Sequence, residues 1–398
     1  MKMNNLIFEK NFQLNTTFLK IILIFSFIII AVNFYDWTLK KSYYEYSDWL
    51  INYQGGFTRR GLFGEIVYLI HKVTSIRLDF ILYFFVITMY FLFFLFLQKI
   101  LSRTNLNFLN TLIIFSPLSF IYLASSKTLA GRKEILLFCL ISIFFYNLKK
   151  IKFENVKYWI ITILIISSLT HLGFIFYTPF LILFFIFLYP EKKIKDFLYQ
   201  IIPILGSGML VISLIFYSIF FSKPELIEIC ESIKVFVKNC PEQTYIGFLE
   251  NSLLEVSQVN LNFWSNNYII KYPIYFILSF APIIYAFNNL KDNKIFKKKN
   301  LLMFLLVSFI FTVPVFFLGA DYGRYMNWQY IFFLFIYLHI INFKILKINE
   351  KNHFFNLKVS KIFLFLIIFL YGFVWSVPHC CDKNYSFLYD KLLNNLFF

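Results

Sequence analysis

One short segment of the chain combines the residue types that bind phosphate. Residues 53–65 read YQGGFTRRGLFGE. The members with this chemistry are three glycines and two arginines: Gly55, Gly56, Gly61, Arg59 and Arg60. Glycine allows a tight backbone turn, arginine forks match phosphate oxygens, and a helix starting at the last glycine presents free amides to an anion. The segment predicts a phosphate site; an Arg60–Glu65 pair, or arginines that reach toward the membrane surface, are the alternatives.

Two other segments, 128–134 and 319–325, repeat this chemistry. Each places glycine and a basic residue at the expected start of a helix, where the backbone dipole also attracts anions. Their residues of interest are Gly131, Arg132, Lys133, Asp321, Gly323 and Arg324. In the alternative, Asp321 and Arg324 pair with each other and Glu134 caps its helix. Three such clusters favour one shared anionic ligand, for which a diphosphate is the natural candidate.

Catalysis by proton transfer needs a carboxylate or an imidazole within hydrogen-bond reach of the reacting hydroxyl. Asp48, which precedes the first segment, is the first candidate for a general base, and Asp321 is the second. His171 lies in the polar turn 167–173 and is a candidate for a proton or phosphate contact, with a structural role as the alternative. The sequence contains no Asp-x-Asp pair, no His/Cys set with metal-ligand spacing and no GxxxxGK[ST] loop. We therefore predict neither a metal nor a cofactor.

The elements that position these residues are apolar runs. The chain is 60% hydrophobic and only 15% charged, and its charges cluster between the runs. Eleven runs are long enough to be considered as spans: 19–35, 79–97, 108–124, 135–147, 158–169, 172–189, 197–221, 272–289, 301–318, 329–343 and 362–377. We predict an all-α membrane protein with about 11 transmembrane helices, forming one polytopic domain over residues 1–398.

The charges decide the orientation of these spans. One side of the predicted topology holds 22 of the 38 Lys and Arg residues and six of the 21 Asp and Glu residues, which is a net charge of +16. The other side has a net charge of +1. Because short cytoplasmic loops collect Lys and Arg, the N-terminus is predicted to be cytoplasmic and the C-terminus extracytoplasmic. The net charge of +17 is thereby explained by topology, and nucleic acid is not a predicted partner.

The three Gly-Arg segments all fall on the outer side. That side also has two long loops, 36–79 and 222–271, and the first carries an amphipathic pattern at 61–72 that predicts a helix lying at the membrane interface. The runs 135–147 and 158–169 are short for a hydrocarbon core of about 30 Å. Their outer ends carry polar residues, so we predict that they end below the surface and leave a recessed cavity.

Cys230 and Cys240 share the second outer loop. An oxidising compartment would allow a disulfide between them. Spacing alone does not establish the required geometry, so a bridged pair and two free thiols both remain open.

With this hydropathy layout over the whole chain, the outer segments 55–61, 132–133 and 321–324 resemble bacterial polymerases of O-antigen or capsular polysaccharide. The layout is also similar to the wider GT-C class of membrane glycosyltransferases. The motif match is confined to those segments. The large later outer loop of this chain, 222–271, contains no arginine. The chain departs here from a family pattern in which that loop also carries arginines.

The resemblance implies an enzyme of the inner membrane that joins oligosaccharide units carried on undecaprenyl diphosphate at the outer face. Its partners would be this lipid-linked oligosaccharide, membrane lipids and other polysaccharide-assembly proteins. By match of role, arginines would hold the diphosphate and stabilise it as a leaving group: Arg59, Arg60, Arg132 and Arg324. The alternatives are a GT-C enzyme that adds one sugar from a polyprenyl-phosphate donor and a flippase for a lipid-linked glycan.

Overall fold

The computed structural model describes residues 13–40, 43–125, 127–222, 224–237, 239–242, 244–249, 258, 269–292, 295–319, 321–348 and 360–379. Contacts divide the chain into two compact units. Unit 1 comprises Met1–Ser26, Leu97–Leu129 and Ser257–Phe398, and unit 2 comprises Phe27–Phe96 and Ala130–Val256.

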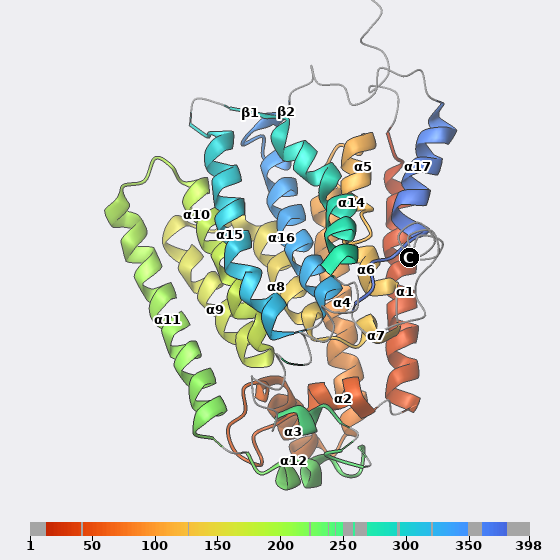
Figure 1. Ribbon diagram of the computed structural model, residues 1–398, viewed down its shortest axis with the longest axis vertical. Helices are drawn as coiled ribbons and strands as arrows, with labels where there is room; N and C mark the ends of the chain where they lie inside the picture. Colours follow the sequence, from red (N-terminus) through yellow and green to blue (C-terminus); the bar gives the residue numbers. More distant parts are fainter. Residues whose placement is uncertain are drawn as a thin grey trace, which may run out of the picture. The chain divides into compact units, whose positions relative to one another are not determined.

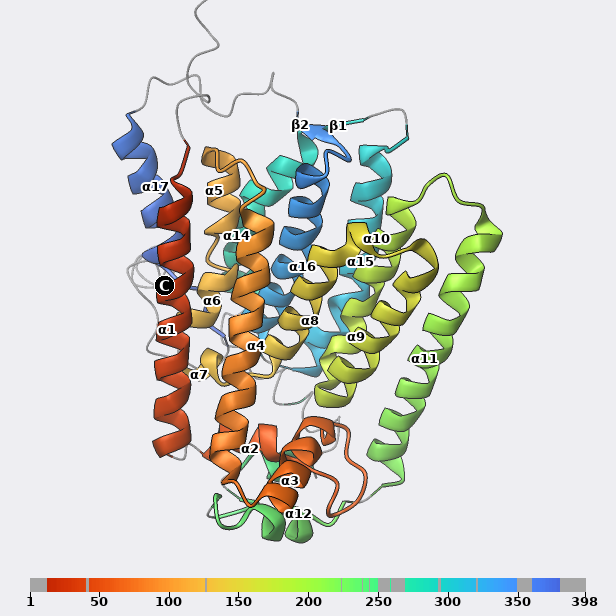
Figure 2. The same ribbon diagram turned by 180° about the vertical axis from the view of Figure 1, so that it is seen from behind.

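Almost all of the described elements are helices (Figures 1 and 2). The α-helices are α1 (Thr16–Lys40), α2 (Tyr43–Leu50), α3 (Leu62–Thr74), α4 (Leu78–Leu101), α5 (Phe108–Ile114), α6 (Phe120–Ala124), α7 (Lys127–Ala130), α8 (Glu134–Asn147), α9 (Val156–Thr170), α10 (Thr178–Leu188), α11 (Ile194–Phe220), α12 (Leu226–Ile233), α14 (Ile269–Asn288), α15 (Lys298–Leu318), α16 (Tyr322–Asn342) and α17 (Lys361–Phe373). Short 3-10 helices are η2 (Leu148–Lys150), η3 (Phe153–Asn155), η4 (Leu172–Tyr177) and η5 (Tyr245–Leu249). In the described residues the only strands are β1 (Leu290–Lys291) and β2 (Lys347–Ile348), which pair antiparallel in unit 1. The all-α prediction is confirmed for this part of the chain.

Every predicted apolar run falls wholly or partly on helix. Within the described residues, five helical stretches have the length and hydropathy of a membrane span: Thr16–Asp36, Leu78–Leu101, Ile194–Phe220, Ile270–Asn288 and Lys298–Phe317. These five indicate a multi-pass membrane protein. The larger number of about 11 spans stays a prediction, because the other helices are shorter or less apolar.

The run 108–124 is interrupted in the structure. Residues 115–119 separate α5 from α6, and Pro117, which has no amide hydrogen, lies in the break. The carbonyl of Leu118 accepts a hydrogen bond from Asn327 Nδ2 at 2.8 Å. A polar side chain from α16 therefore satisfies backbone that the broken helix leaves unpaired, as an apolar environment requires.

α16 is the most deeply enclosed helix described in unit 1, because its residues from Tyr322 to Ile340 are all buried. It contacts α14 and α15, and its Tyr330 and Tyr337 hydroxyls donate to the Ile113 carbonyl and to Asn110 Oδ1, each at 2.7 Å. An enclosed helix does not face lipid, so it can carry polar side chains that a lipid-facing span could not.

Unit 2 contains the two short helices that the sequence predicts. α8 and α9 have 14 and 15 residues, which is about 21–23 Å of helix against a hydrocarbon core of about 30 Å. α9 packs on α8, α10 and α11, and most of α8 is buried. The short lengths are confirmed, whereas the recessed cavity above them stays a prediction.

Three short helices of unit 2 form a terminal assembly, which we define as α2, α3 and α12. It lies beyond the ends of α4, α9 and α11 (Figures 1 and 2). α3 is the predicted amphipathic helix, found one residue later than its predicted start. It buries Phe63 and Val67 and exposes Ile66, Leu69 and Val73.

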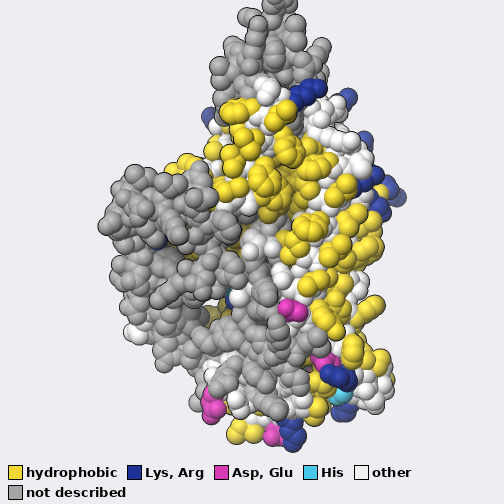
Figure 3. All heavy atoms as spheres, turned by 90° about the vertical axis from the view of Figure 1, so that its right-hand side faces the viewer, with side chains coloured by type: hydrophobic (Ala, Val, Ile, Leu, Met, Phe, Trp, Pro, Cys, Tyr) yellow, Lys and Arg dark blue, Asp and Glu magenta, His cyan; other side chains and the backbone are white. Residues whose placement is uncertain are grey.

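The long apolar helices expose hydrophobic side chains. On α11 the exposed ones include Leu198, Tyr199, Ile202, Leu205, Met209 and Phe216. Figure 3 draws a different face, the right-hand side of Figure 1, and hydrophobic side chains gather there as well. Exposed apolar surface of this extent is unfavourable in water and is suited to contact with hydrocarbon.

Candidate anion-binding site

The Gly-Arg segment forms a tight loop between α2 and α3. Gly56 has φ of +105°, a conformation that glycine adopts without strain. The Glu65 carboxylate accepts hydrogen bonds from the Tyr53 amide at 2.8 Å and from Gln54 Nε2 at 3.0 Å. Gly61 is the residue from which α3 starts. The first turn of α3 thus ties down the beginning of the loop, and both arginines lie in the short stretch between.

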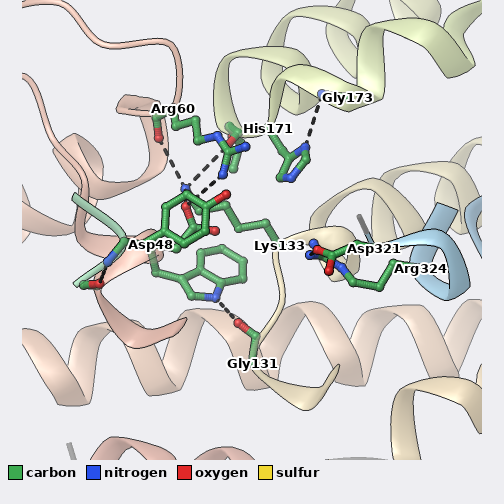
Figure 4. Close-up of polar contacts among 12 residues, drawn as sticks. Asp48, Arg60, Gly131, Lys133, His171, Gly173, Asp321 and Arg324 are labelled. Carbon is green, nitrogen blue, oxygen red and sulfur yellow. Dashed lines mark hydrogen bonds and ion pairs between the residues drawn. The ribbon is translucent and has the colours of Figure 1, made fainter. Parts of the chain in front are cut away.

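Asp48, on α2, supplies the central carboxylate of the site (Figure 4). Its Oδ1 lies 3.2 Å from Lys133 Nζ and 3.6 Å from Arg60 Nη1. Lys133 Nζ also donates to the backbone carbonyls of Arg60 and Thr170, each at 3.4 Å. The Lys133 side chain is 0% exposed and that of Asp48 is 6% exposed. Four stretches of unit 2 therefore meet at the Asp48–Lys133 pair: α2, the Gly-Arg loop, the turn before α8 and the end of α9.

The charges at this carboxylate change its acidity. Burial alone would raise the pKa of Asp48, but nearby cations outweigh burial and hold that pKa below its ordinary value. In order of effect, these cations are Lys133, Arg60 and Arg132. We define the basic cluster as Asp48 together with Arg59, Arg60, Arg132 and Lys133.

Two of these cations hold their protons less tightly than usual. Burial lowers the pKa of Lys133 to about 8, a shift that Asp48 opposes and Arg60 increases. Burial and repulsion from Arg60 lower the pKa of Arg59 to about 10. Burial is the main cause of both shifts, and Arg60 adds to each of them. The basic cluster as defined contains four cations and one carboxylate.

Aromatic side chains fix the turn that carries Lys133. Trp49 Nε1 donates to the Gly131 carbonyl at 2.6 Å, and the Tyr90 hydroxyl donates to the Ala130 carbonyl at 3.0 Å. Trp49 and Tyr90 are both fully buried. The role of Gly131 is thus to present its carbonyl to the residue that follows Asp48.

The second predicted outer loop contacts the Gly-Arg loop. The Glu225 amide donates to the Gly55 carbonyl at 2.8 Å. A Cβ on Gly55 would lie 2.2 Å from the Glu225 carbonyl oxygen, so no larger residue fits without movement. Cys230, on α12, and Cys240 form a disulfide, with their Cα atoms 5.6 Å apart.

Tyr245 reaches the basic cluster from the same loop. Its amide donates to Ser47 Oγ at 2.8 Å, and its ring centroid lies 4.8 Å from Arg60 Cζ. The ring therefore makes a cation–π contact with the guanidinium that pairs with Asp48. Sequence reasoning missed Tyr245, whose only signal is that it follows the cysteine pair in the chain.

His171 has a local structural contact in unit 2. It ends α9, and its Nδ1 accepts a hydrogen bond from the Gly173 amide at 3.2 Å (Figure 4). Its ring lies 4.9 Å from that of Phe174. The preceding residue, Thr170, is the one whose carbonyl contacts Lys133. His171 is thus the next residue after one that contacts Lys133, and one of its ring nitrogens caps its own turn.

Asp321 and Arg324 belong to unit 1. The two side chains form an ion pair through Asp321 Oδ2 and Arg324 Nη1, as the local-pair alternative predicts. Arg324 also lies over the Trp328 ring, with 5.9 Å from Cζ to the centroid. A Cβ on Gly323 would lie 2.0 Å from the Pro378 carbonyl oxygen, so this glycine allows a close backbone approach.

The structure brings together Asp48, Arg60, Arg132 and Lys133 in unit 2 and places Arg59 beside Arg60. It gives Asp321 and Arg324 each other as partners. Within the described residues, no group of three or more His, Cys, Asp or Glu side chains is placed to hold a metal ion.

Neither a scan against protein-family models nor searches of curated proteins and of solved structures find a match for this chain.

Proposed function

We propose that the chain is a membrane glycosyltransferase whose basic cluster binds the phosphate groups of a lipid-linked sugar donor. In the specific form of this proposal, it is a polymerase of O-antigen or capsular polysaccharide. It would transfer oligosaccharide units from undecaprenyl diphosphate at the outer face of the inner membrane.

One observation carries the proposal: three cations, Lys133, Arg60 and Arg132, gather around the buried Asp48 carboxylate, and Arg59 lies beside Arg60. Positive charges held close together in a buried site repel one another, and a bound anion would offset that repulsion. A diphosphate is an anion that suits such a site. Arginine forks hold phosphate oxygens in pairs, and a cationic site stabilises a diphosphate as it leaves.

Asp48 fits the role of a base that becomes active when the donor is bound. With the cluster empty, its lowered pKa makes it a weak proton acceptor. A bound anion would draw Arg60 and Lys133 toward itself and add negative charge next to Asp48. Both effects raise the pKa of a carboxyl group, so Asp48 would accept a proton from an acceptor hydroxyl only once the donor is in place.

The orientation of the chain is part of the proposal. The lysine-rich loops favour a cytoplasmic side opposite to the basic cluster. The disulfide in residues 224–249 supports the same orientation, because disulfides persist in oxidising compartments. Membrane-impermeant thiol labelling of a cysteine at Lys193 and of another at Ser222, the two ends of α11, would test it. The second position alone should react in intact cells.

The proposal is tested by deleting the gene in the native host and separating surface glycan by gel. Loss of the polymerase should leave a single repeat unit on the lipid anchor. Complete loss of surface glycan would count against a polymerase and favour a single-sugar transferase or a flippase.

Alanine variants of the four predicted arginines test the site itself: Arg59, Arg60, Arg132 and Arg324. Those at the basic cluster should reproduce the deletion at normal protein level. Arg77→Ala is the matched control, because Arg77 also lies in unit 2 but pairs with Asp79 and its side chain is 60% exposed. If all four variants stay active, the diphosphate site is wrong.

A further inference from the structure

Residues 224–249 contact the first long loop at two separate places. On one side, the Glu225 amide bonds to the Gly55 carbonyl at 2.8 Å, and Ser232 Oγ accepts from Asn52 Nδ2 at 2.8 Å. Both contacts involve α12 or the residue before it. They place α12 against the start of the Gly-Arg loop.

On the other side, Tyr245 contacts Arg60 and Ser47, the residue before Asp48. Its ring covers the Arg60 guanidinium at 4.8 Å, and its amide bonds to Ser47, the residue before Asp48. Ser47 is fully buried. Tyr245 is therefore in a position to set the orientation of Arg60 relative to Asp48.

The Cys230–Cys240 disulfide joins these two contact regions. Cys230 lies in α12, between Glu225 and Ser232, and Cys240 lies five residues before Tyr245. Beyond Cys240, Thr244 continues the connection, because its amide and its hydroxyl both donate to the Pro241 carbonyl, at 3.0 and 2.8 Å. The covalent bond thus ties the contact at Gly55 to the contact at Arg60.

We propose that this disulfide locks Tyr245 over Arg60 and so keeps the basic cluster ready to bind phosphate. Tyr245 is then a positioning residue, and the lock acts through it. The effect on phosphate binding rests on the function proposed above, whereas the effect on the Gly-Arg loop does not.

The physical reason is that each contact by itself is weak. A single hydrogen bond or cation–π contact contributes only modestly to stability, because it replaces contacts with water. Cross-linking the two regions removes much of the freedom of the chain between them. Without the bond, the Tyr245 segment can separate from Arg60 while α12 stays docked at Gly55.

The test compares oxidised and reduced protein in detergent. A dithiol such as dithiothreitol transfers two electrons and two protons to the Cys230–Cys240 bond, giving two thiols, and itself becomes a cyclic disulfide. Mass spectrometry verifies the reduction. Two readouts follow: hydrogen–deuterium exchange of peptides covering 52–61, and binding of inorganic diphosphate. The double variant Cys230→Ser/Cys240→Ser provides the same comparison without reductant.

We expect reduction to accelerate exchange in 52–61 at least severalfold and to weaken diphosphate binding at least tenfold, with exchange in α9 and α11 unchanged. Unchanged exchange in 52–61 after verified reduction overturns the lock. Faster exchange in a protein that binds no diphosphate in either state supports the lock and contradicts the proposed function.

Two substitutions separate positioning from general stability. Tyr245→Phe keeps the ring and should bind diphosphate within twofold of the unmodified protein. Tyr245→Leu should lose binding about as strongly as reduction does, and reduction should then add little. If Tyr245→Leu binds normally while disulfide reduction still weakens binding, Tyr245 is not the residue through which the lock acts.

Discussion

Lys133 and Asp48 are 85 residues apart in the chain, and Lys133 Nζ lies 3.2 Å from Asp48 Oδ1 in the interior of unit 2. The pair joins the turn before α8 to α2. Arg60, whose guanidinium lies 3.6 Å from the same oxygen, joins the Gly-Arg loop to both. One carboxylate on α2 therefore holds together two stretches whose cations would otherwise repel each other.

Removal of one partner from this buried pair should destabilise the protein strongly. We expect Lys133→Met to cost on the order of 3 kcal/mol, because the Asp48 carboxylate stays buried with a weaker counter-charge. The double variant Asp48→Asn/Lys133→Met should cost less than the sum of the two single changes. Thermal unfolding in detergent measures the loss of stability of each variant.

The control for this cycle is Lys234→Met. Lys234 pairs with Glu231, but both side chains are well exposed, at 66% and 59%. Exposed ion pairs contribute little to stability, so the unfolding temperature of the Lys234→Met variant should hardly differ from that of the unmodified protein. Equal effects at Lys133 and Lys234 would contradict the buried-pair interpretation.

Diphosphate binding should weaken as the pH rises through about 8. The lowered pKa of Lys133 means that its ammonium loses its proton there in the unliganded protein. A bound anion favours the charged form, so above pH 8 binding must take up a proton, and affinity falls by up to tenfold per pH unit. Calorimetry between pH 6.5 and 9.5 would measure this dependence.

Lys133→Arg separates this effect from ionisation of the ligand. Its guanidinium remains charged over the whole range. The variant should therefore lose the decrease that Lys133 causes and retain only the dependence of inorganic diphosphate itself. An identical pH dependence in both proteins would exclude Lys133 as the titrating group.

Much of the helical layout could be predicted because hydropathy is a local property of the chain. The short lengths of α8 and α9 follow directly from where their apolar residues begin and end. The break at 115–119 has a local signal in Pro117, but the partner of its backbone has none. That partner is Asn327, more than 200 residues later, whose amide bonds to the Leu118 carbonyl.

The site was predictable in its residue types and less so in its pairings. Glycine beside arginine predicted one anionic ligand shared by three clusters, and the structure places Arg60 and Lys133, from two of them, at the same carboxylate. The same signal was ambiguous at Arg324, where the structure shows a pair with Asp321 three residues away. No local pattern links Tyr245 to Arg60, because their contact depends on how two distant loops dock.

Gly55→Ala should loosen the docking of these loops. Its Cβ would lie 2.2 Å from the Glu225 carbonyl oxygen, which is backbone and cannot rotate away. We expect faster proteolysis within 52–61 and weaker diphosphate binding. Gly206→Ala is the matched control: this α11 residue has no heavy atom within 4 Å of the added Cβ, and alanine favours helix. The prediction fails if the two variants behave alike.

α3 should lie along the membrane surface with one side in the acyl chains. Its exposed apolar residues Ile66, Leu69 and Val73 follow helical spacing, and Lys72 lies at the edge of the stripe that they form. Spin labels on single cysteines at Leu69 and at Lys72 would be compared in lipid vesicles, with Cys380 and Cys381 replaced by serine. The label at Leu69 should be relaxed more by oxygen, which concentrates in hydrocarbon, and the label at Lys72 more by a water-soluble nickel chelate. If both labels respond more to the chelate, α3 is solvated on every side, and its apolar residues must meet a protein partner instead of lipid.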